Sequence, residues 1–115
     1  MALFVRDRVF EHYAMTEEDQ AMLVELLSLI ALLQLRQEGK VIFKGIELAE
    51  IFQGFPWGLP DDHQAQEMVR EHMERYQVSA PLKRLLYAAI LVEITYTLAK
   101  EDKLLWVKSP AATVA

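Results

Sequence analysis

The sequence predicts an all-α fold, a small bundle of four to five helices around two central hydrophobic helices at residues 17–38 and 80–101. Both segments are apolar nearly all round, which is typical of helices that neighbours cover on every side. Each ends in polar or helix-breaking residues, at Gly39 and at 100–103. Because 115 residues is close to the commonest domain size, we expect one helical domain over 1–109 and a flexible tail over 110–115.

Capping signals place the remaining helices. Residues 3–14 carry apolar side chains at helical spacing and predict a short N-terminal helix, and 46–53 show the same period. Two prolines and two glycines exclude a helix at 54–60. The predicted N-caps are Thr16 before 17–38, Asp61 or Asp62 before 62–77 with Gln64 in the capping-box position, and Ser79 before 80–101.

Two short β-prone segments follow the two long helices, at 40–44 and 104–107. Residues 35–43 and 98–106 also share a pattern at an offset of 63: an apolar helix end, a polar break and an apolar segment ending in an aromatic residue. The segments can pair as a minor two-stranded ribbon, or the halves can be related by a pseudo-twofold axis. Because the identities are few, the sequence favours coincidence.

Composition excludes several classes of protein. The net charge of −5 disfavours nucleic-acid binding, because contacts from Lys and Arg to phosphates supply most of that affinity. The absence of cysteine excludes disulfides, thiolate metal sites and Cys nucleophiles. The first residues lack a secretory pattern, and the longest apolar run, 21–35, is interrupted and too short to span a bilayer. We therefore expect a cytoplasmic protein without a membrane partner.

Three polar residues are candidates for a metal site. Glu25 and Glu93 are lone carboxylates in apolar helices, and His72 lies on the apolar face of its helix. An unpaired charge is expensive to bury, so each acid is solvated, paired with a base such as Arg36 or Arg84, or bound to a ligand. If the three converged, they would form a carboxylate and imidazole set suited to iron or manganese. The Glu-x-x-His repeat of such sites is missing, which favours structural roles.

The loop at 54–60 is the candidate partner-binding site. Phe55, Trp57 and Leu59 lie on a segment stiffened by proline and glycine, and aromatic residues are enriched where interfaces bind most strongly. The alternative is that Phe55 and Trp57 fold back into the core. No glycine-rich phosphate loop or nucleophile motif occurs, so the sequence predicts neither a cofactor nor catalytic activity.

Residues 26–47, LLSLIALLQLRQEGKVIFKGIE, resemble the TerB-type tellurite-resistance helical family. That family has an apolar helix, an Asp-Gly break and an acidic residue opening the next helix, and its two acidic halves are associated with metal binding. Here the break is Glu38-Gly39, Glu47 lies further along, and no acidic helix follows Glu101-Asp102. The resemblance covers about a fifth of the chain and implies a metal-binding helical bundle.

The predicted function is a small interaction or regulatory module that forms a homodimer or binds another protein. The 53% hydrophobic content supports it, because so small a domain has little interior in which to hide apolar surface. A metal- or small-ligand-binding bundle is the second interpretation. A winged-helix-like nucleic-acid binder, with 40–44 and 103–107 as the wing, is the third.

Overall fold

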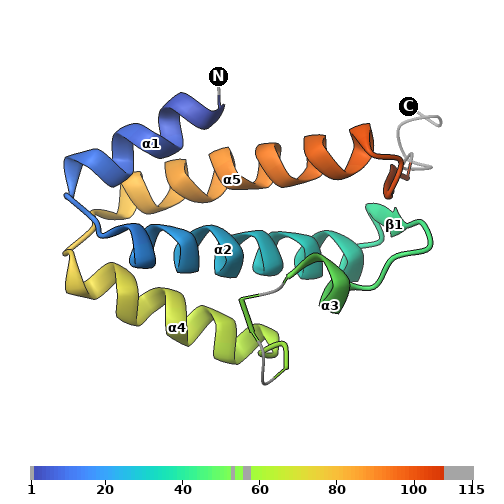
Figure 1. The fold of residues 1–115 in the computed structure, drawn as a ribbon, viewed down its shortest axis with the longest axis horizontal. Helices are drawn as coiled ribbons and strands as arrows, with labels where there is room; N and C mark the ends of the chain where they lie inside the picture. Colours follow the sequence, from blue (N-terminus) through green and yellow to red (C-terminus); the bar gives the residue numbers. More distant parts are fainter. Residues whose placement is uncertain (1, 53, 56–57, 108–115) are drawn as a thin grey trace.

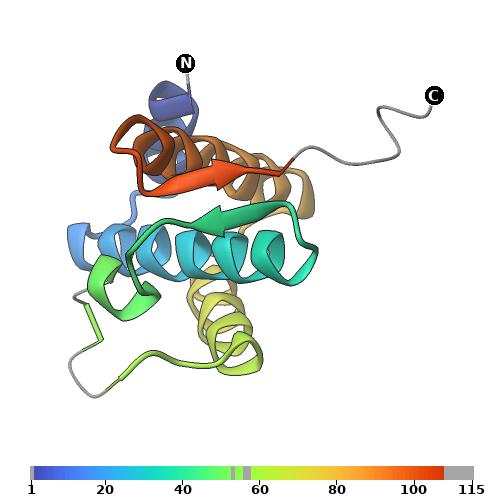
Figure 2. The same cartoon turned by 90° about the vertical axis from the view of Figure 1, so that its right-hand side faces the viewer.

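The computed structural model describes residues 2–52, 54–55 and 58–107, and this part of the chain confirms the predicted fold class. Five helices pack together, and a two-stranded antiparallel sheet lies at one end of the bundle (Figures 1 and 2). The elements in order are α1 Ala2–His12, α2 Glu17–Gln37, β1 Val41–Phe43, α3 Leu48–Ile51, α4 Asp62–Arg75, α5 Ala80–Lys100 and β2 Leu104–Trp106.

Helix α2 is the centre of the bundle. It packs between α4 and α5, and α1 lies on the far side of α5 (Figure 1). Four of its leucines, Leu23, Leu26, Leu29 and Leu32, have no exposed surface at all. Helix α5 is equally apolar but less covered, because α1 and α2 contact only part of its circumference. The two hydrophobic helices predicted from the sequence are therefore buried to different extents.

The helix starts follow the predicted caps. The Thr16 hydroxyl accepts from the backbone amide of Asp19 at 3.1 Å, and Asp61 and Gln64 form the reciprocal capping box of α4. Ser79 caps α5 without a side-chain hydrogen bond. The helix predicted at 46–53 is reduced to the single turn α3, because Glu47 and Phe52 on either side of it are extended.

The two short strands pair with each other antiparallel, which is the ribbon alternative for the internal pattern. Ile42 lies opposite Leu105, its equivalent at the offset of 63, in the middle of the ribbon (Figure 2). The flanking backbone bonds match too: Lys44 N donates to Lys103 O at 2.8 Å, and Val107 N to Lys40 O at 2.9 Å. The predicted two-stranded ribbon is therefore confirmed. The residues that share the sequence pattern also occupy equivalent positions in it, although the few identities had favoured coincidence.

The two helix ends before the ribbon are equivalent as well. Gly39 has φ +70° and Asp102 has φ 59°, so both lie in the left-handed region. The amide of Lys40 donates to Leu35 O at 2.9 Å, and that of Lys103 to Leu98 O at 2.8 Å. Both helices thus end in the same C-terminal motif, in which a left-handed residue turns the chain back into the strand.

Candidate interaction surface

Glu93 is held by a basic residue that the sequence did not indicate. Arg6 on α1 donates from Nη1 to Glu93 Oε1 at 2.8 Å, and both side chains are mostly buried between α1 and α5. Glu93 is therefore an ion-pair residue joining the first and last helices. Its partner is neither Arg36 nor Arg84, since the turn at residues 13–16 folds α1 back along α5.

His72 belongs to a polar cluster between α2 and α4. Its Nδ1 lies 2.8 Å from Met68 O, and its Nε2 lies 3.6 Å from Asp19 Oδ1. Asp19 is almost fully buried, accepts a short hydrogen bond from the Tyr76 hydroxyl, and contacts Arg75 Nη1 at 3.1 Å. The Tyr76 hydrogen bond lowers the pKa of Asp19 below its usual value, with Thr16, Arg75 and His72 acting in the same direction.

Asp19 is the polar residue that sequence reasoning missed. The sequence presents it as one of three first-turn acids of α2, and nothing in that pattern separates it from Glu17 and Glu18. Arg75 on α4 turns across the helix pair toward Asp19. On the exposed side of α4, Arg70 bonds both Glu67 and Glu74.

Glu25 lies beside the segment that follows α3. Its carboxylate packs so closely on Gly54 that a Cβ there would come within 1.9 Å of Oε2. Glu25 also lines a hollow between α1 and α2 to which Arg6 contributes. The three candidate ligands thus have different neighbours: Gly54 for Glu25, Arg6 for Glu93 and Asp19 for His72. Within the described residues, no group of three or more His, Asp or Glu side chains is placed to hold a metal ion.

In the loop at 54–60, the described apolar side chains Phe55 and Leu59 both lie against the core. Phe55 is buried, in contact with Phe52 through tilted rings 6.5 Å apart, so the structure realises the alternative in which it fills the core. Leu59 is half-buried and packs against the same core cluster. Trp57 lies outside the described residues. In this structure the loop therefore does not offer Phe55 to a partner.

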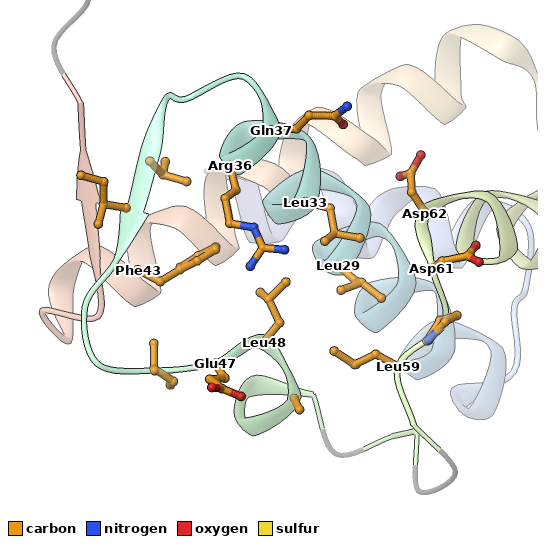
Figure 3. Close-up of a pocket in the computed structure, with 15 residues that line it drawn as sticks. Leu29, Leu33, Arg36, Gln37, Phe43, Glu47, Leu48, Leu59, Asp61 and Asp62 are labelled. Atoms are coloured by element: carbon orange, nitrogen blue, oxygen red, sulfur yellow. The ribbon is translucent and has the colours of Figure 1, made fainter.

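A hollow of about 1000 Å³ lies between the end of α2, β1, α3 and the start of α4. Leu29, Leu33, Leu48 and Leu59 form an apolar floor, and Arg36 points into the hollow (Figure 3). The Arg36 guanidinium lies 5.7 Å from the centre of the Phe43 ring. Glu47, Asp61 and Asp62 stand on the rim. Because Asp61 caps α4, its carboxylate is already used by the fold.

Among the described side chains, the exposed large apolar residues on helices all lie on α5. Leu85, Val92 and Tyr96 are 46%, 53% and 66% exposed, and the small residues Ala88 and Ala99 are exposed between and beyond them. These five residues recur at spacings of three and four, so they form one continuous row along the helix. We call this row the α5 stripe. It lies next to the Arg6–Glu93 ion pair, which balances the charge of the nearest acid.

A second apolar surface covers the outer face of the ribbon. Ile42 and Leu105 are each 53% exposed, and Val107 continues the surface just beyond β2. Trp106 is 49% exposed but alternates to the other face, with Val41. The lysines around the ribbon are each held by an acid: Lys40 by Glu38, Lys44 by Asp102 and Lys103 by Glu101. The ribbon is therefore apolar on its outer face, with its positive charges neutralised.

Comparison of the chain with known proteins identifies no relative. No family model matches the chain, and neither the curated proteins nor the solved structures contain a significant match. In the part of the chain that the structure describes, no helix has both the length and the apolar character needed to cross a bilayer.

Proposed function

We propose that this chain is a small cytoplasmic interaction module without catalytic activity, and that it associates with itself through the α5 stripe. The observation that carries the proposal is the exposure of three large apolar side chains, Leu85, Val92 and Tyr96, in one row on one helix. Scattered apolar residues are normal on a protein surface, whereas a contiguous apolar patch is typical of a binding site.

The geometry of α5 supports this function. The outer side of a surface helix is normally polar, but α5 is apolar on the sides that face α1 and α2 and also along the stripe. Within the described part of the chain, neither Val92 nor Tyr96 belongs to the two core clusters, so core packing does not explain why these residues are apolar. A partner that covers the stripe gives these side chains a structural role.

The expected association is weak. Each large side chain of the stripe is about half exposed, so covering it contributes on the order of 1 kcal/mol. Three such side chains from each of two copies give roughly 6 kcal/mol, and the cost of association takes up most of it, so we expect a dimer only at high protein concentration and in exchange with its monomer. A contact one helix wide is also smaller than the roughly 800 Å² per partner of standard interfaces.

The hollow at Arg36 and the ribbon support the two alternative functions, ligand binding and nucleic-acid binding, less well than the α5 stripe supports self-association. The hollow at Arg36 mixes one guanidinium with three carboxylates and has no paired donors converging on a point. The nucleic-acid interpretation needs a positively charged ribbon, and Lys40, Lys44 and Lys103 are each bound to an acid.

Sedimentation velocity over a wide concentration range tests the proposal. The wild-type chain should show a sedimentation coefficient that rises with concentration, and Val92→Glu should remain a monomer because it places a charge in the stripe. Thr97→Glu is the matched control: it adds the same charge to an exposed site of α5 outside the stripe. A wild-type chain that stays monomeric up to millimolar concentration, or equal effects of the two variants, would overturn the proposal.

A further inference from the structure

The α5 stripe has a repeat that suits a straight helix. Leu85 and Tyr96 are eleven residues apart, as are Ala88 and Ala99, with Val92 in the middle of the row. Eleven residues make almost three whole helical turns, so such a row follows the helix axis without drifting around it. Two such helices can stay in contact along the whole stripe without strong supercoiling.

The order of large and small residues is complementary to its own reverse. Read forward, the stripe is Leu85, Ala88, Val92, Tyr96, Ala99. When a second copy runs antiparallel with its Val92 opposite Val92, Leu85 faces Ala99 and Tyr96 faces Ala88. Leu85 and Tyr96, the two largest side chains of the stripe, then each meet an alanine, and only Val92 meets itself; facing side chains of this kind interdigitate without voids or clashes.

The parallel arrangement lacks this fit. It would place Tyr96 against Tyr96 and Leu85 against Leu85, with Ala88 and Ala99 facing only each other's small copies. The bulky pairs would hold the helices apart while the alanine pairs left gaps, and lost contact across a gap is lost attraction. In parallel copies identical residues would therefore face each other, and their shapes would not fit together.

Charge favours the same direction. The N-terminal turns of α5 carry Lys83 and the exposed Arg84, whereas at its C-terminal end Glu101 and Asp102 are paired with Lys103 and Lys44. In the antiparallel pair the two basic N-terminal turns lie at opposite ends of the contact, and the helix dipoles oppose each other favourably. In the parallel pair Arg84 would lie beside Arg84.

From this pattern we infer that the occupant of the α5 stripe is a second copy of the chain, bound antiparallel across a twofold axis at Val92. The inference rests on the proposed self-association and specifies its geometry. Such an interface is isologous, so each contact occurs twice and only the residue at the axis meets itself. It also closes the assembly at two copies, because the same stripe is used on both sides.

The absence of cysteine from the chain makes the geometry directly measurable. In single-cysteine variants under mild oxidation, Val92→Cys should form a disulfide-linked dimer, because helices packed 8–10 Å apart bring facing residues within disulfide range. Ala99→Cys should not, because in the antiparallel pair the two copies of residue 99 lie about 21 Å apart along the helices. Thr97→Cys, exposed but outside the stripe, measures linking by random collision.

Each outcome decides the inference. Rapid linking of Val92→Cys, with Ala99→Cys and Thr97→Cys at the collision level, supports it; a mixture of Ala88→Cys and Tyr96→Cys should then give a mixed dimer. Linking of Ala99→Cys as fast as Val92→Cys means a parallel pair and overturns it. If every variant links only at the collision rate while sedimentation still shows a dimer, the antiparallel geometry is wrong but the proposed self-association is supported. If every measurement shows a monomer, both the geometry and the self-association are wrong.

Discussion

The carboxylate of Glu25 lies directly against Gly54, so that a Cβ at position 54 would come within 1.9 Å of Glu25 Oε2. The contact places a charged side chain of the central helix beside the segment that leads from α3 to the loop. An acid in a nearly all-apolar helix is therefore accommodated because the residue packed on it has no side chain.

Gly54→Ala should force the Glu25 carboxylate out of its position. Because Oε2 is the end of a flexible side chain, rotation can relieve the clash, and the expected cost is about 0.5–1.5 kcal/mol in the free energy of unfolding. In a Glu25→Ala background the same change should cost nothing or stabilise slightly. A double-mutant cycle by urea denaturation measures the difference, since the effect of alanine on the unfolded chain cancels. An equal cost in both backgrounds would show that the contact is unimportant.

Asp19 should make stability depend on acid pH. Its folded-state pKa lies below the ordinary value of 3.8, chiefly because of the Tyr76 hydroxyl, so its stabilising contribution is present above pH 3.8. That contribution is lost as the pH falls from there through the folded-state pKa. In Tyr76→Phe the NMR-titrated pKa of Asp19 should rise toward the ordinary value. An unchanged titration in the variant would assign the shift to another group.

Asp19→Asn should lower the free energy of unfolding at neutral pH by about 1.5–3 kcal/mol, the range for hydrogen bonds to a charged group. The gap between wild type and Asp19→Asn should narrow as the pH falls below about 3.8, because protonation removes the same charge from the wild type. Urea unfolding at a series of pH values measures this gap. Glu18→Asn, at an exposed neighbouring position, should show little of either effect.

Arg6→Met should cost more than Glu93→Gln. Removing Arg6 leaves the mostly buried Glu93 carboxylate without its bonded partner, at an expected cost of about 1–3 kcal/mol. Glu93→Gln keeps an oxygen that still accepts from Arg6 Nη1. Thermal unfolding of both variants and of the double variant measures the coupling. If Glu93→Gln proved the more costly of the two, the ion pair would not be the main role of Arg6.

Leu104 and Leu105 are neighbours on β2 that should respond very differently to truncation. Leu104 is 3% exposed and packs in the core, so Leu104→Ala should cost about 2–4 kcal/mol. Leu105 is 53% exposed on the outer face of the ribbon, and Leu105→Ala should change the free energy of unfolding by less than about 0.5 kcal/mol. Urea denaturation at low protein concentration makes the comparison. Similar costs for both would mean that the ribbon is covered on both faces.

Much of the fold could be predicted because it depends on local patterns. The long apolar segments, the Thr16 and Asp61 caps and the left-handed turn at Gly39 are each visible within a few residues of sequence. Asp102 was harder to anticipate, because only the equivalence of the two halves indicates a left-handed residue there. Local rules of this kind hold wherever the chain is later packed.

The polar contacts depended on which helices meet. Arg6 and Glu93 are 87 positions apart and Asp19 and Tyr76 are 57 apart, so no spacing rule connects them. Burial of Phe55 followed from the path of the loop back to α2, which composition does not describe.

The sequence by itself determined that α2 and α5 are helices, where they begin and end, and that both are apolar on nearly every side. Only the tertiary structure decided that α2 is enclosed while one side of α5 stays uncovered. The reason is physical: α2 has α4 on one flank and α5 on the other, whereas the described elements that contact α5, namely α1, α2 and β2, leave Leu85, Val92 and Tyr96 about half exposed or more. Periodicity records which side chains are apolar, and packing alone decides which of them remain exposed to a partner.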